Sequence, residues 1–370
     1  MKTTFTSESV CAGHPDKICD QISDAIVDAA LIKDPYSRVA VETLVTKNYV
    51  TMAGEVTTKG RLNYKKIAQD VIKKLGYTKI CYGFSNASPI TVKIHSQSSE
   101  IAAGVDDLGA GDQGMMFGYA SVESPELMPL PIMIAHRMAE EMDKLKLIKK
   151  YLRPDGKTQV TVIYENGKPV AVDNVVLAVP HDEAVKLSQV KEDLYKFIVV
   201  PVLAKYKMSC RPTRSTVNGT GVWHIGGPVS DTGVTGRKII VDTYGAMARV
   251  GGGCFSGKDA TKVDRSGAYA ARFLAKNIVA AGLADRCEVR LAYFIGAKKP
   301  VMQETETFGT AKKSNTIINS FMDKLLDTSV AGIIGQLSLR KPIYLQTAAY
   351  GHFGKPNLPW KKSLTYKNNV

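Results

Sequence analysis

The stretch Thr158-Gln-Val-Thr-Val-Ile-Tyr164, followed after Asn166-Gly167 by Val170-Ala-Val-Asp-Asn-Val-Val-Leu-Ala-Val179, gives the clearest indication of the fold. Both halves are rich in β-branched residues, which favour strands. Asn-Gly is a preferred dipeptide for two-residue hairpin turns, because both turn positions need a positive φ. The stretch therefore predicts an antiparallel hairpin in the middle of the chain.

Helix and strand signals alternate on the N-terminal side of this hairpin. Apolar residues recur at helical spacing after His14-Pro15-Asp16-Lys17, which predicts a helix that begins there. Strand composition over 39–45 and 50–56 predicts a second hairpin with its turn at Lys47-Asn48. A helix over about 67–75 and a strand over 90–95 are expected next, and then a long Gly-rich loop that extends to Gly114.

The C-terminal half continues the alternation. We expect a helix from about Glu192 to Val200, which Pro201 ends or kinks. The expected elements after it are a strand over 238–242, a helix over 261–281, a strand over 288–294 and a helix over 317–326. Hairpins mixed with helices favour an α+β fold.

The composition is typical of a soluble globular protein: of 370 residues, 44% are hydrophobic and 23% are charged. At roughly 100 to 200 residues per domain, we expect two or three domains. No run approaches the roughly 20 apolar residues of a membrane span, and the N-terminus lacks the apolar core of a signal peptide. We therefore expect a cytoplasmic protein without membrane contact.

The net charge of +14 attracts anions such as nucleotides, polyphosphates or nucleic acid. Much of it sits on dispersed lysines without interleaved aromatics, which favours a solvated surface over a nucleic-acid stripe. The 6 cysteines and 6 histidines are scattered without a C-x-x-C pair, so a zinc site has little support. Any metal should therefore be held by oxygen.

Two Gly-rich stretches resemble nucleotide-binding motifs. Gly109-Ala-Gly-Asp-Gln-Gly114 matches G-x-G-x-x-G, but no apolar strand leads into it and Asp112 stands where a pyrophosphate would lie. Gly252-Gly-Cys-Phe-Ser-Gly-Lys258 matches most of a P-loop, but Asp259 replaces the Ser or Thr that holds magnesium. Neither predicts a standard nucleotide fold, and each alone could be a tight turn.

Cations and carboxylates gather in Gly-flanked sequence around these stretches. They occur in Gly13-His-Pro-Asp-Lys17, Gly236-Arg-Lys238, Gly257-Lys-Asp259 and Lys262-Val-Asp264. Lys and Arg offset phosphate charge, Asp holds a hard cation against phosphate oxygens, and a helix N-terminus adds N–H donors. This mixture suits a polyphosphate with a divalent metal.

The same residues resemble the signatures of the S-adenosylmethionine synthetase family, the methionine adenosyltransferases. The resemblance covers nearly the whole chain and keeps the family's motif order. Its motifs are Phe5-Thr-Ser-Glu-Ser9, Gly13-His-Pro-Asp-Lys17, Gly109-Ala-Gly-Asp-Gln-Gly114, Gly236-Arg-Lys-Ile-Ile-Val-Asp-Thr-Tyr-Gly245, Gly251-Gly-Gly-Cys-Phe-Ser-Gly-Lys-Asp259, Lys262-Val-Asp-Arg-Ser266 and Thr347-Ala-Ala-Tyr-Gly-His-Phe-Gly354.

The resemblance implies that ATP, L-methionine and water give S-adenosylmethionine, phosphate and diphosphate. The methionine sulfur attacks C5′ of ATP, and the bound tripolyphosphate is then cleaved. The leaving group gains charge, so it needs a donor at the C5′ oxygen and cations along the phosphates. His14 matches the leaving-group residue, although alone it could equally be a helix-capping or packed histidine. The matching phosphate ligands, which complete the catalytic set, are Lys17, Lys157, Arg237, Lys238 and Lys258.

Metal sites are implied in the same way. Asp16 and Asp264 match the Mg²⁺ carboxylates, with two ions expected per site, and each could otherwise be a helix cap. Glu42 shares its strand face with Ala40 and Leu44, and a carboxylate on an apolar face needs a partner. The resemblance makes that partner K⁺, with backbone oxygen near Cys254, and the alternative is an ion pair with Lys or Arg.

Methionine must be held by both ends of its zwitterion, so that its sulfur can approach C5′ in line. The matching positions are Glu55, Gln97, Asp112, Asp231 and Lys262, each of which could alone be a surface or turn residue. Asp231 also matches a nucleoside contact, as does Asp155 beside Lys157.

The sequence departs from the family at three places. Trp223 stands at the position of the aromatic that stacks on adenine, where a larger ring preserves stacking. Cys254 replaces the common Ala after three glycines and adds volume near the nucleotide. The loop from Gln97 to Gly109 is shorter than usual, and in the family this loop closes over the site, so the departure bears on the gating rate and on tolerance of bulkier methionine analogues, without fixing the direction of either effect.

The implied fold is three similar α/β units with approximate threefold symmetry, each a mixed sheet with helices on one side. The expected units are 1–100, 101–225 beginning with the Gly-rich gating loop, and 226–370, interleaved by exchanged segments. The resemblance also implies a homodimer or homotetramer with sites between subunits. Two alternatives stay open: another ATP-dependent phosphotransferase, from the near-P-loop, and a nucleic-acid-binding protein, from the charge.

Overall fold

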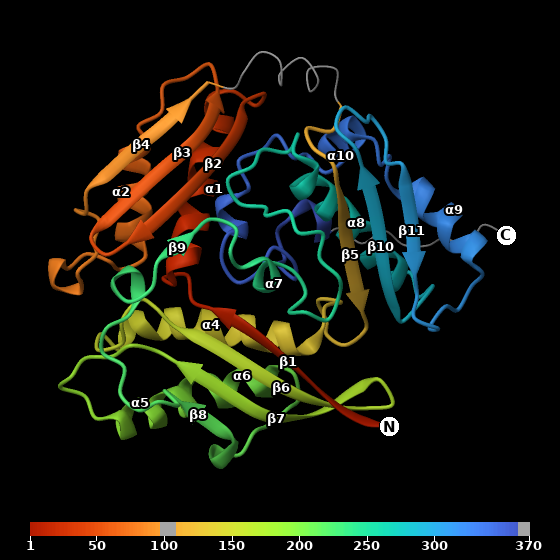
Figure 1. The fold of residues 1–370 in the computed structure, drawn as a ribbon. Helices are drawn as coiled ribbons and strands as arrows, with labels where there is room; N and C mark the ends of the chain where they lie inside the picture. The colour runs from red at the N-terminus through yellow and green to blue at the C-terminus, as the bar shows by residue number, and fades with distance from the viewer. Residues whose placement is uncertain (97–108, 362–370) are drawn as a thin grey trace.

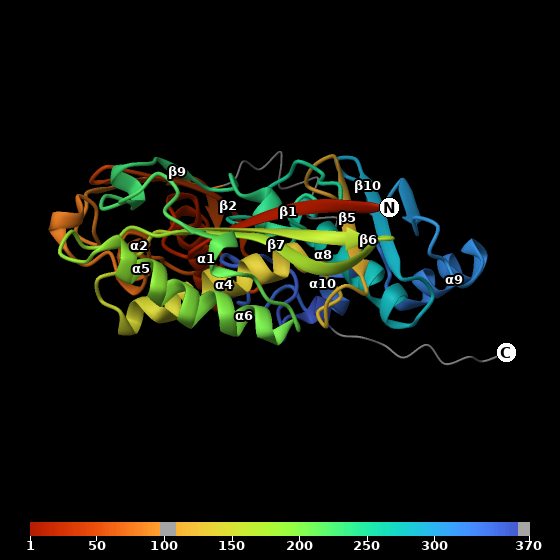
Figure 2. The same ribbon diagram turned by 90° about the horizontal axis from the view of Figure 1, so that it is seen from below.

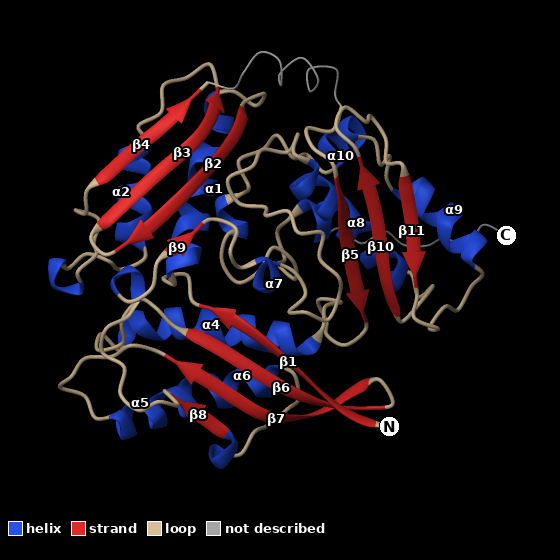
Figure 3. Cartoon of the chain, in the orientation of Figure 1, coloured by secondary structure: helices blue, strands red, loops and turns tan. Residues whose placement is uncertain are grey.

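Three β-sheets surround a central region filled by loops (Figure 1), and helices cover only one face of this arrangement (Figures 2 and 3). The computed structural model describes residues 1–96 and 109–361. Gln97 and most of the expected gating loop lie outside this range. The mixed α/β fold of three similar units with helices on one side is thus confirmed. The expectation that each sheet is mixed holds for two of the three described sheets, because the third has only antiparallel pairings.

The first sheet has the order β1-β6-β7-β8 and contains the predicted central hairpin as β6 and β7. Asn166 and Gly167 form its turn, both with positive φ (50° and 76°). The sheet is mixed, because β8 runs parallel to β7. Its strands are β1 (Lys2–Val10), β6 (Lys157–Glu165), β7 (Lys168–Ala178) and β8 (Ser215–Val217); its helices are α4 (Leu130–Ile148), α5 (Leu187–Leu194) and α6 (Val200–Lys205).

The second sheet has the order β4-β3-β2-β9 and is also mixed, since β4 is parallel to β3. The predicted hairpin forms β2 and β3, and the predicted helix begins at Pro15. The strands are β2 (Arg38–Thr46), β3 (Tyr49–Thr57), β4 (Ile90–His95) and β9 (Gly233–Val234); the helices are α1 (Pro15–Lys33) and α2 (Tyr64–Lys74).

The third sheet has the order β11-β10-β5, with both pairings antiparallel. Gly118 on β5 lets α8 approach closely, because a Cβ there would lie 1.9 Å from the carbonyl carbon of Ala271. The strands are β5 (Gly114–Ser121), β10 (Arg286–Tyr293) and β11 (Met302–Glu306); the helices are α8 (Val263–Ala280), α9 (Asn315–Leu325) and α10 (Val330–Gln336).

Each sheet takes a strand from a distant part of the chain. The N-terminal β1 pairs with β6, β5 pairs with β10, and β9 pairs with β2. One buried apolar cluster lies mainly under the second and third sheets, and a smaller one lies under the first. Boundaries after residues 100 and 225 stay a prediction. No helix among the described residues is long and apolar enough to cross a membrane.

Two predicted elements differ in the structure. The prediction of a strand over 238–242 is wrong. Ile239–Asp242 form the short helix α7 in the central region (Figure 1). This segment pairs with no strand, and its backbone forms hydrogen bonds within the segment. The helix expected to start near Glu192 begins at Leu187 and runs past Pro201 to Lys205. A π-helical stretch at Tyr195–Val199 precedes Pro201, and this wider turn accommodates the proline ring and its missing N–H.

Candidate functional site

Four aspartates on helix α1 organise the central region. Asp16, Asp20, Asp24 and Asp28 stand at successive i,i+4 positions and therefore share one face of the helix. Each accepts backbone hydrogen bonds from a segment more than 200 residues away. Only Asp16 was predicted as a site residue, although the i,i+4 spacing is the sequence signal for the other three.

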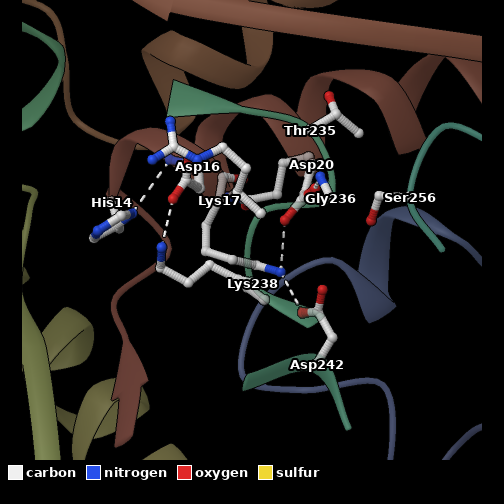
Figure 4. A network of polar contacts seen from close by, with 12 residues as sticks. His14, Asp16, Lys17, Asp20, Thr235, Gly236, Lys238, Asp242 and Ser256 are labelled. Carbon is white, nitrogen blue, oxygen red and sulfur yellow. Dashed lines mark hydrogen bonds and ion pairs between the residues drawn. The ribbon is translucent and has the colours of Figure 1, made fainter. Parts of the chain in front are cut away.

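The first two aspartates fix the loop that carries Arg237 and Lys238 (Figure 4). Asp16 Oδ1 accepts from the N–H of Val234 at 2.9 Å, and Asp20 Oδ1 accepts from the N–H of Gly236 at 2.8 Å. The ammonium of Lys238 lies 2.5 Å from Asp16 Oδ2. Burial raises the pKa of Asp16, but the hydrogen bonds from Lys238 and Val234 outweigh it and lower the pKa. The carboxylate is therefore ionised at neutral pH.

Asp24 fixes the second Gly-rich loop. Its carboxylate accepts from the N–H of Gly257 at 2.9 Å and from the hydroxyl of Ser256 at 3.0 Å. Arg265 of α8 donates to both oxygens, at 2.6 and 2.8 Å, and both side chains are fully buried. This bidentate pair joins the loop, α1 and α8.

His14 is the N-cap of α1 and directly precedes the helix face that carries the four aspartates. Its Nδ1 accepts the N–H of Asp16 at 3.2 Å, so the proton of the neutral ring lies on Nε2. Nε2 is buried and has no hydrogen-bond partner. Burial, then the charges of Lys238 and Lys157, lower the pKa of His14 to about 3. The ring is thus a neutral donor. The cap role is confirmed, and the leaving-group role stays a prediction.

Lys17 lies deeper than the other predicted phosphate ligands. Its side chain is fully buried, and its ammonium lies 2.9 Å from Asp20 and 2.5 Å from Asp242. Burial lowers its pKa, but the two carboxylates outweigh this and raise it. In this arrangement Lys17 ties α1 to α7, and direct phosphate contact stays a prediction.

The remaining cations near His14 are more accessible. Arg237 is 54% exposed, with Nε 3.8 Å from Asp16 Oδ1. Lys157 is exposed at the start of β6, and its charge acts on the ring of His14. The structure therefore gathers His14, Asp16 and three cations, Lys157, Arg237 and Lys238, around the N-terminus of α1.

A second group lies where the 251–258 loop crosses strand β2. The ammonium of Lys258 lies 2.6 Å from Asp264 Oδ2, and Lys258 forms a β-bridge to Ala40. Gly253 faces this carboxylate closely, since a Cβ there would lie 2.3 Å from Asp264 Cγ. Cys254 is half-buried, and burial raises its thiol pKa. Only a short, Gly-rich loop can place these groups together.

Glu42 differs from the expectation about its surroundings. The face that it shares with Ala40 and Leu44 is the open face of the second sheet, and Leu44 is 37% exposed there. The core face carries Val39, Val41 and Val45 instead. Within the described residues no Lys or Arg forms a close ion pair with Glu42, but the charge of Lys258 acts on it and opposes the effect of burial, which raises its pKa. Both the K⁺ site and the ion pair stay predictions.

The predicted methionine-side residues are dispersed in the single chain. Glu55 lies 3.4 Å from His95 Nε2, Lys262 lies 2.6 Å from Asp259, and Asp112 accepts from the N–H of Gln113. Asp231 is exposed in the turn before β9. Across residues 1–96 and 109–361, no hydrogen bond or ion pair joins them to the His14 group.

Two of the predicted nucleoside contacts, Asp155 and Trp223, are connected through the segment 225–227. Asp155 is buried and accepts from the N–H groups of Gly156 and Gly227, at 2.7 and 2.8 Å. Burial raises its pKa despite these bonds. Trp223 is half-buried, and its Nε1 donates to the carbonyl of Ile225 at 2.6 Å. The 225–227 segment thus links the two residues.

The two Gly-rich stretches are not nucleotide folds. Gly109–Gly114 leads into strand β5 and not into a helix. Lys258 is followed by a turn, and α8 begins only at Val263, so the strand-loop-helix context of a P-loop is missing. No group of three His, Cys, Asp or Glu suited to a metal occurs in the described part of the chain. Asp16 and Asp264 would therefore need substrate oxygens to complete a hard-cation site.

Comparison with known proteins gives a consistent result over the whole chain. Three family models match: the N-terminal domain of S-adenosylmethionine synthetase at 2–99, its central domain at 107–223 and its C-terminal domain at 225–362. The chain is also 50% identical over 380 aligned residues to the S-adenosylmethionine synthase of Desulforudis audaxviator (strain MP104C), covering 98% of this chain and 96% of that protein.

Proposed function

Because this chain belongs to the S-adenosylmethionine synthetase family and is a methionine adenosyltransferase, we propose that the His14 group carries out the adenosyl transfer. In this reaction a lone pair of the methionine sulfur forms the bond to C5′ of ATP. The bond from C5′ to its oxygen breaks, and tripolyphosphate leaves. Water then cleaves tripolyphosphate to phosphate and diphosphate.

The observation that carries this proposal is the unpartnered Nε2–H of His14. Its other nitrogen accepts from Asp16 N–H, which fixes the tautomer and the ring orientation. A buried donor with no partner is costly unless a substrate atom completes it. We place the C5′ oxygen there, because it gains negative charge as the bond breaks and a preorganised donor stabilises that charge.

The phosphates would lie along the cations that surround this donor. Three cations carry positive charge next to His14: Lys238, Arg237 and Lys157. We propose that Lys258 in the 251–258 loop adds a fourth phosphate contact. Backbone N–H groups at the start of α1 add to this field. Asp155 and Trp223 would hold the nucleoside, with Trp223 stacked on adenine and Cys254 beside the nucleotide.

The carboxylates suit the family's cations. Asp16 and Asp264 are hard oxygen donors, each next to a lysine of the phosphate line, and would hold Mg²⁺. Glu42, with backbone oxygen near Cys254, would hold K⁺. When bound, these cations offset the charge of phosphate oxygens in both steps.

The methionine side would be completed by a second copy of the chain. Glu55, Asp112, Asp231 and Lys262 are not joined to the His14 group within one chain. The open sheet faces (Figure 2) expose apolar side chains, among them Leu44, Tyr49 and Met115. We propose a homodimer, or a pair of dimers, with sites between subunits, working in the cytoplasm. A monomeric, fully active enzyme in sedimentation velocity and assay would overturn this.

Rapid-quench kinetics with ATP labelled in the γ-phosphate tests the order of steps. Bound tripolyphosphate should appear before phosphate and diphosphate, in step with S-adenosylmethionine. His14→Asn should slow formation of tripolyphosphate, whereas cleavage of added tripolyphosphate should change less. Equal slowing of both steps would move His14 out of the leaving-group role.

A further inference from the structure

A second cationic cavity lies on the helix-covered side, away from the His14 group. Its volume is about 270 Å³, and it lies between the segment around Glu126, helices α4 and α8, and the segment 354–361. Of the charged residues that line it, one is acidic, Glu126, and five are basic: Arg137, Arg272, Lys276, Lys355 and Lys361.

Most of these cations have no carboxylate partner among the described residues. Arg272 is 2% exposed and donates only to the backbone carbonyls of Tyr119, Leu127 and Glu126. Lys276 is 8% exposed and donates to the carbonyl of Lys361. A buried cation is normally paired with an anion, so this arrangement is unusual.

Lys355 repeats this pattern from the other wall. Its ammonium donates to the carbonyls of Gln346 and Ala349, both at 2.6 Å. Arg137 alone is neutralised, since it pairs with Glu140 at 2.9 Å and with Glu126 at 3.5 Å. One oxygen of Glu126 stays without a partner. The cavity therefore retains an excess of positive charge.

Burial and neighbouring charges lower the pKa values of the two lysines. Burial, then the charges of Arg272 and Lys361, lower the pKa of Lys276 to about 8. Burial, then the charge of Lys17, lower the pKa of Lys355 to about 7, and the carboxylates of Asp242 and Glu140 offset this only in part. For Lys276, whose neighbours Arg272 and Lys361 line the same cavity, an entering anion would offset this repulsion.

We propose that this cavity binds a small multivalent oxyanion of the phosphate class, held by Lys276, Lys355 and Lys361 above the fixed charge of Arg272. The volume of about 270 Å³ lies below the roughly 300 to 1,000 Å³ of pockets for drug-sized ligands, which suits a small oxyanion such as phosphate or diphosphate. An ammonium group has three N–H donors, so each lysine retains donors beyond those that bond to the backbone carbonyls. This site does not depend on the proposed function.

Trp360 provides a local reporter. It lines the cavity and stacks on Tyr269 at a ring-centroid distance of 3.7 Å. The chain has 2 tryptophans, so Trp223→Phe leaves Trp360 alone. In that background, phosphate and diphosphate are titrated separately at constant ionic strength set with sodium chloride. A saturable change in Trp360 emission is expected for at least one of them.

Three variants in the same background locate the binding. Lys276→Gln should weaken it by about tenfold or more, because a charged donor is lost. Lys361→Gln, at an exposed residue that cannot disturb the fold greatly, should weaken it less. Lys313→Gln, an exposed lysine outside the cavity, should leave the affinity unchanged.

Two results would overturn the proposal. One is a response no larger than that to chloride. The other is a response that persists in Lys276→Gln and Lys361→Gln but disappears in Lys258→Ala, since this would assign the binding to the His14 region. Circular dichroism of each variant separates lost binding from lost folding.

Discussion

Asp16 on helix α1 and Lys238 in the loop before α7 form an ion pair of 2.5 Å between positions 222 residues apart. The carboxylate of Asp16 also accepts a hydrogen bond from the N–H of Val234. The backbone N–H of Asp16 donates to Nδ1 of His14. One aspartate thus fixes a cationic loop and a neutral donor relative to each other, which is the arrangement on which the proposed stabilisation of a polyphosphate leaving group rests.

Replacing His14 by Asn should separate its two roles. Asn remains a good N-cap for α1, but its amide does not reach the position of Nε2. We expect kcat to fall by roughly 100-fold or more, with a melting temperature close to that of the wild type. Steady-state kinetics and thermal unfolding check this, and a variant with near-normal kcat would refute the donor role.

The lowered pKa of His14 predicts a pH dependence of stability. The folded ring stays neutral down to about pH 3, while the unfolded ring binds a proton below about pH 6.5. The unfolded state then binds more protons, so the free energy of unfolding falls with decreasing pH in this window, by up to about 1.4 kcal/mol per unit.

His14→Asn lacks this contribution. The unfolding free energy of the wild type minus that of the variant should therefore decrease by roughly 2 kcal/mol between pH 8 and pH 5. Urea unfolding at both pH values measures it. A constant difference would mean that His14 titrates normally in the folded protein.

The buried pair of Asp24 and Arg265 should be important for stability. Asp24→Asn leaves a fully buried guanidinium without its counter-charge, so we expect a loss of about 3 to 5 kcal/mol in the free energy of unfolding. Asp70→Asn breaks an exposed pair with Lys66 and should cost less than about 1 kcal/mol. Similar losses in the two variants would contradict this assignment.

Glu42 should govern the response to monovalent cations. In the wild type, exchange of Na⁺ for K⁺ is expected to raise activity several-fold, because we propose that the carboxylate of Glu42 completes a K⁺ site. Glu42→Gln should remove this difference, whereas Glu8→Gln, an exposed acid on β1, should keep it. An unchanged K⁺ response in Glu42→Gln would exclude this residue.

The sequence predicted those elements in which local pattern and tertiary context agree. The Asn166-Gly167 hairpin and the helix after His14 formed as expected, because turn chemistry and capping are local. The segment 238–242 did not form a strand, although its residues are apolar and β-branched: it forms α7, which lies against the edge strand β1 without pairing with it. Strand propensity is a local signal and does not tell whether tertiary contacts favour a helix at such an edge.

The site was predictable only in part. Resemblance located His14, Asp16 and Lys238, and the structure brings them together. Asp24 and Asp242 were missed, because buried carboxylates reveal their role through partners as distant as Arg265 and Lys17. The surroundings of Glu42 were misjudged, since alternation along a strand does not tell which sheet face is open.

The most direct test is mass spectrometry of the products formed from ATP and L-methionine with Mg²⁺ and K⁺. The wild type and the surface control Asp70→Asn should give S-adenosylmethionine with phosphate and diphosphate, and Asp16→Asn should lose these products. ADP as the product, or undiminished S-adenosylmethionine from Asp16→Asn, would contradict the account.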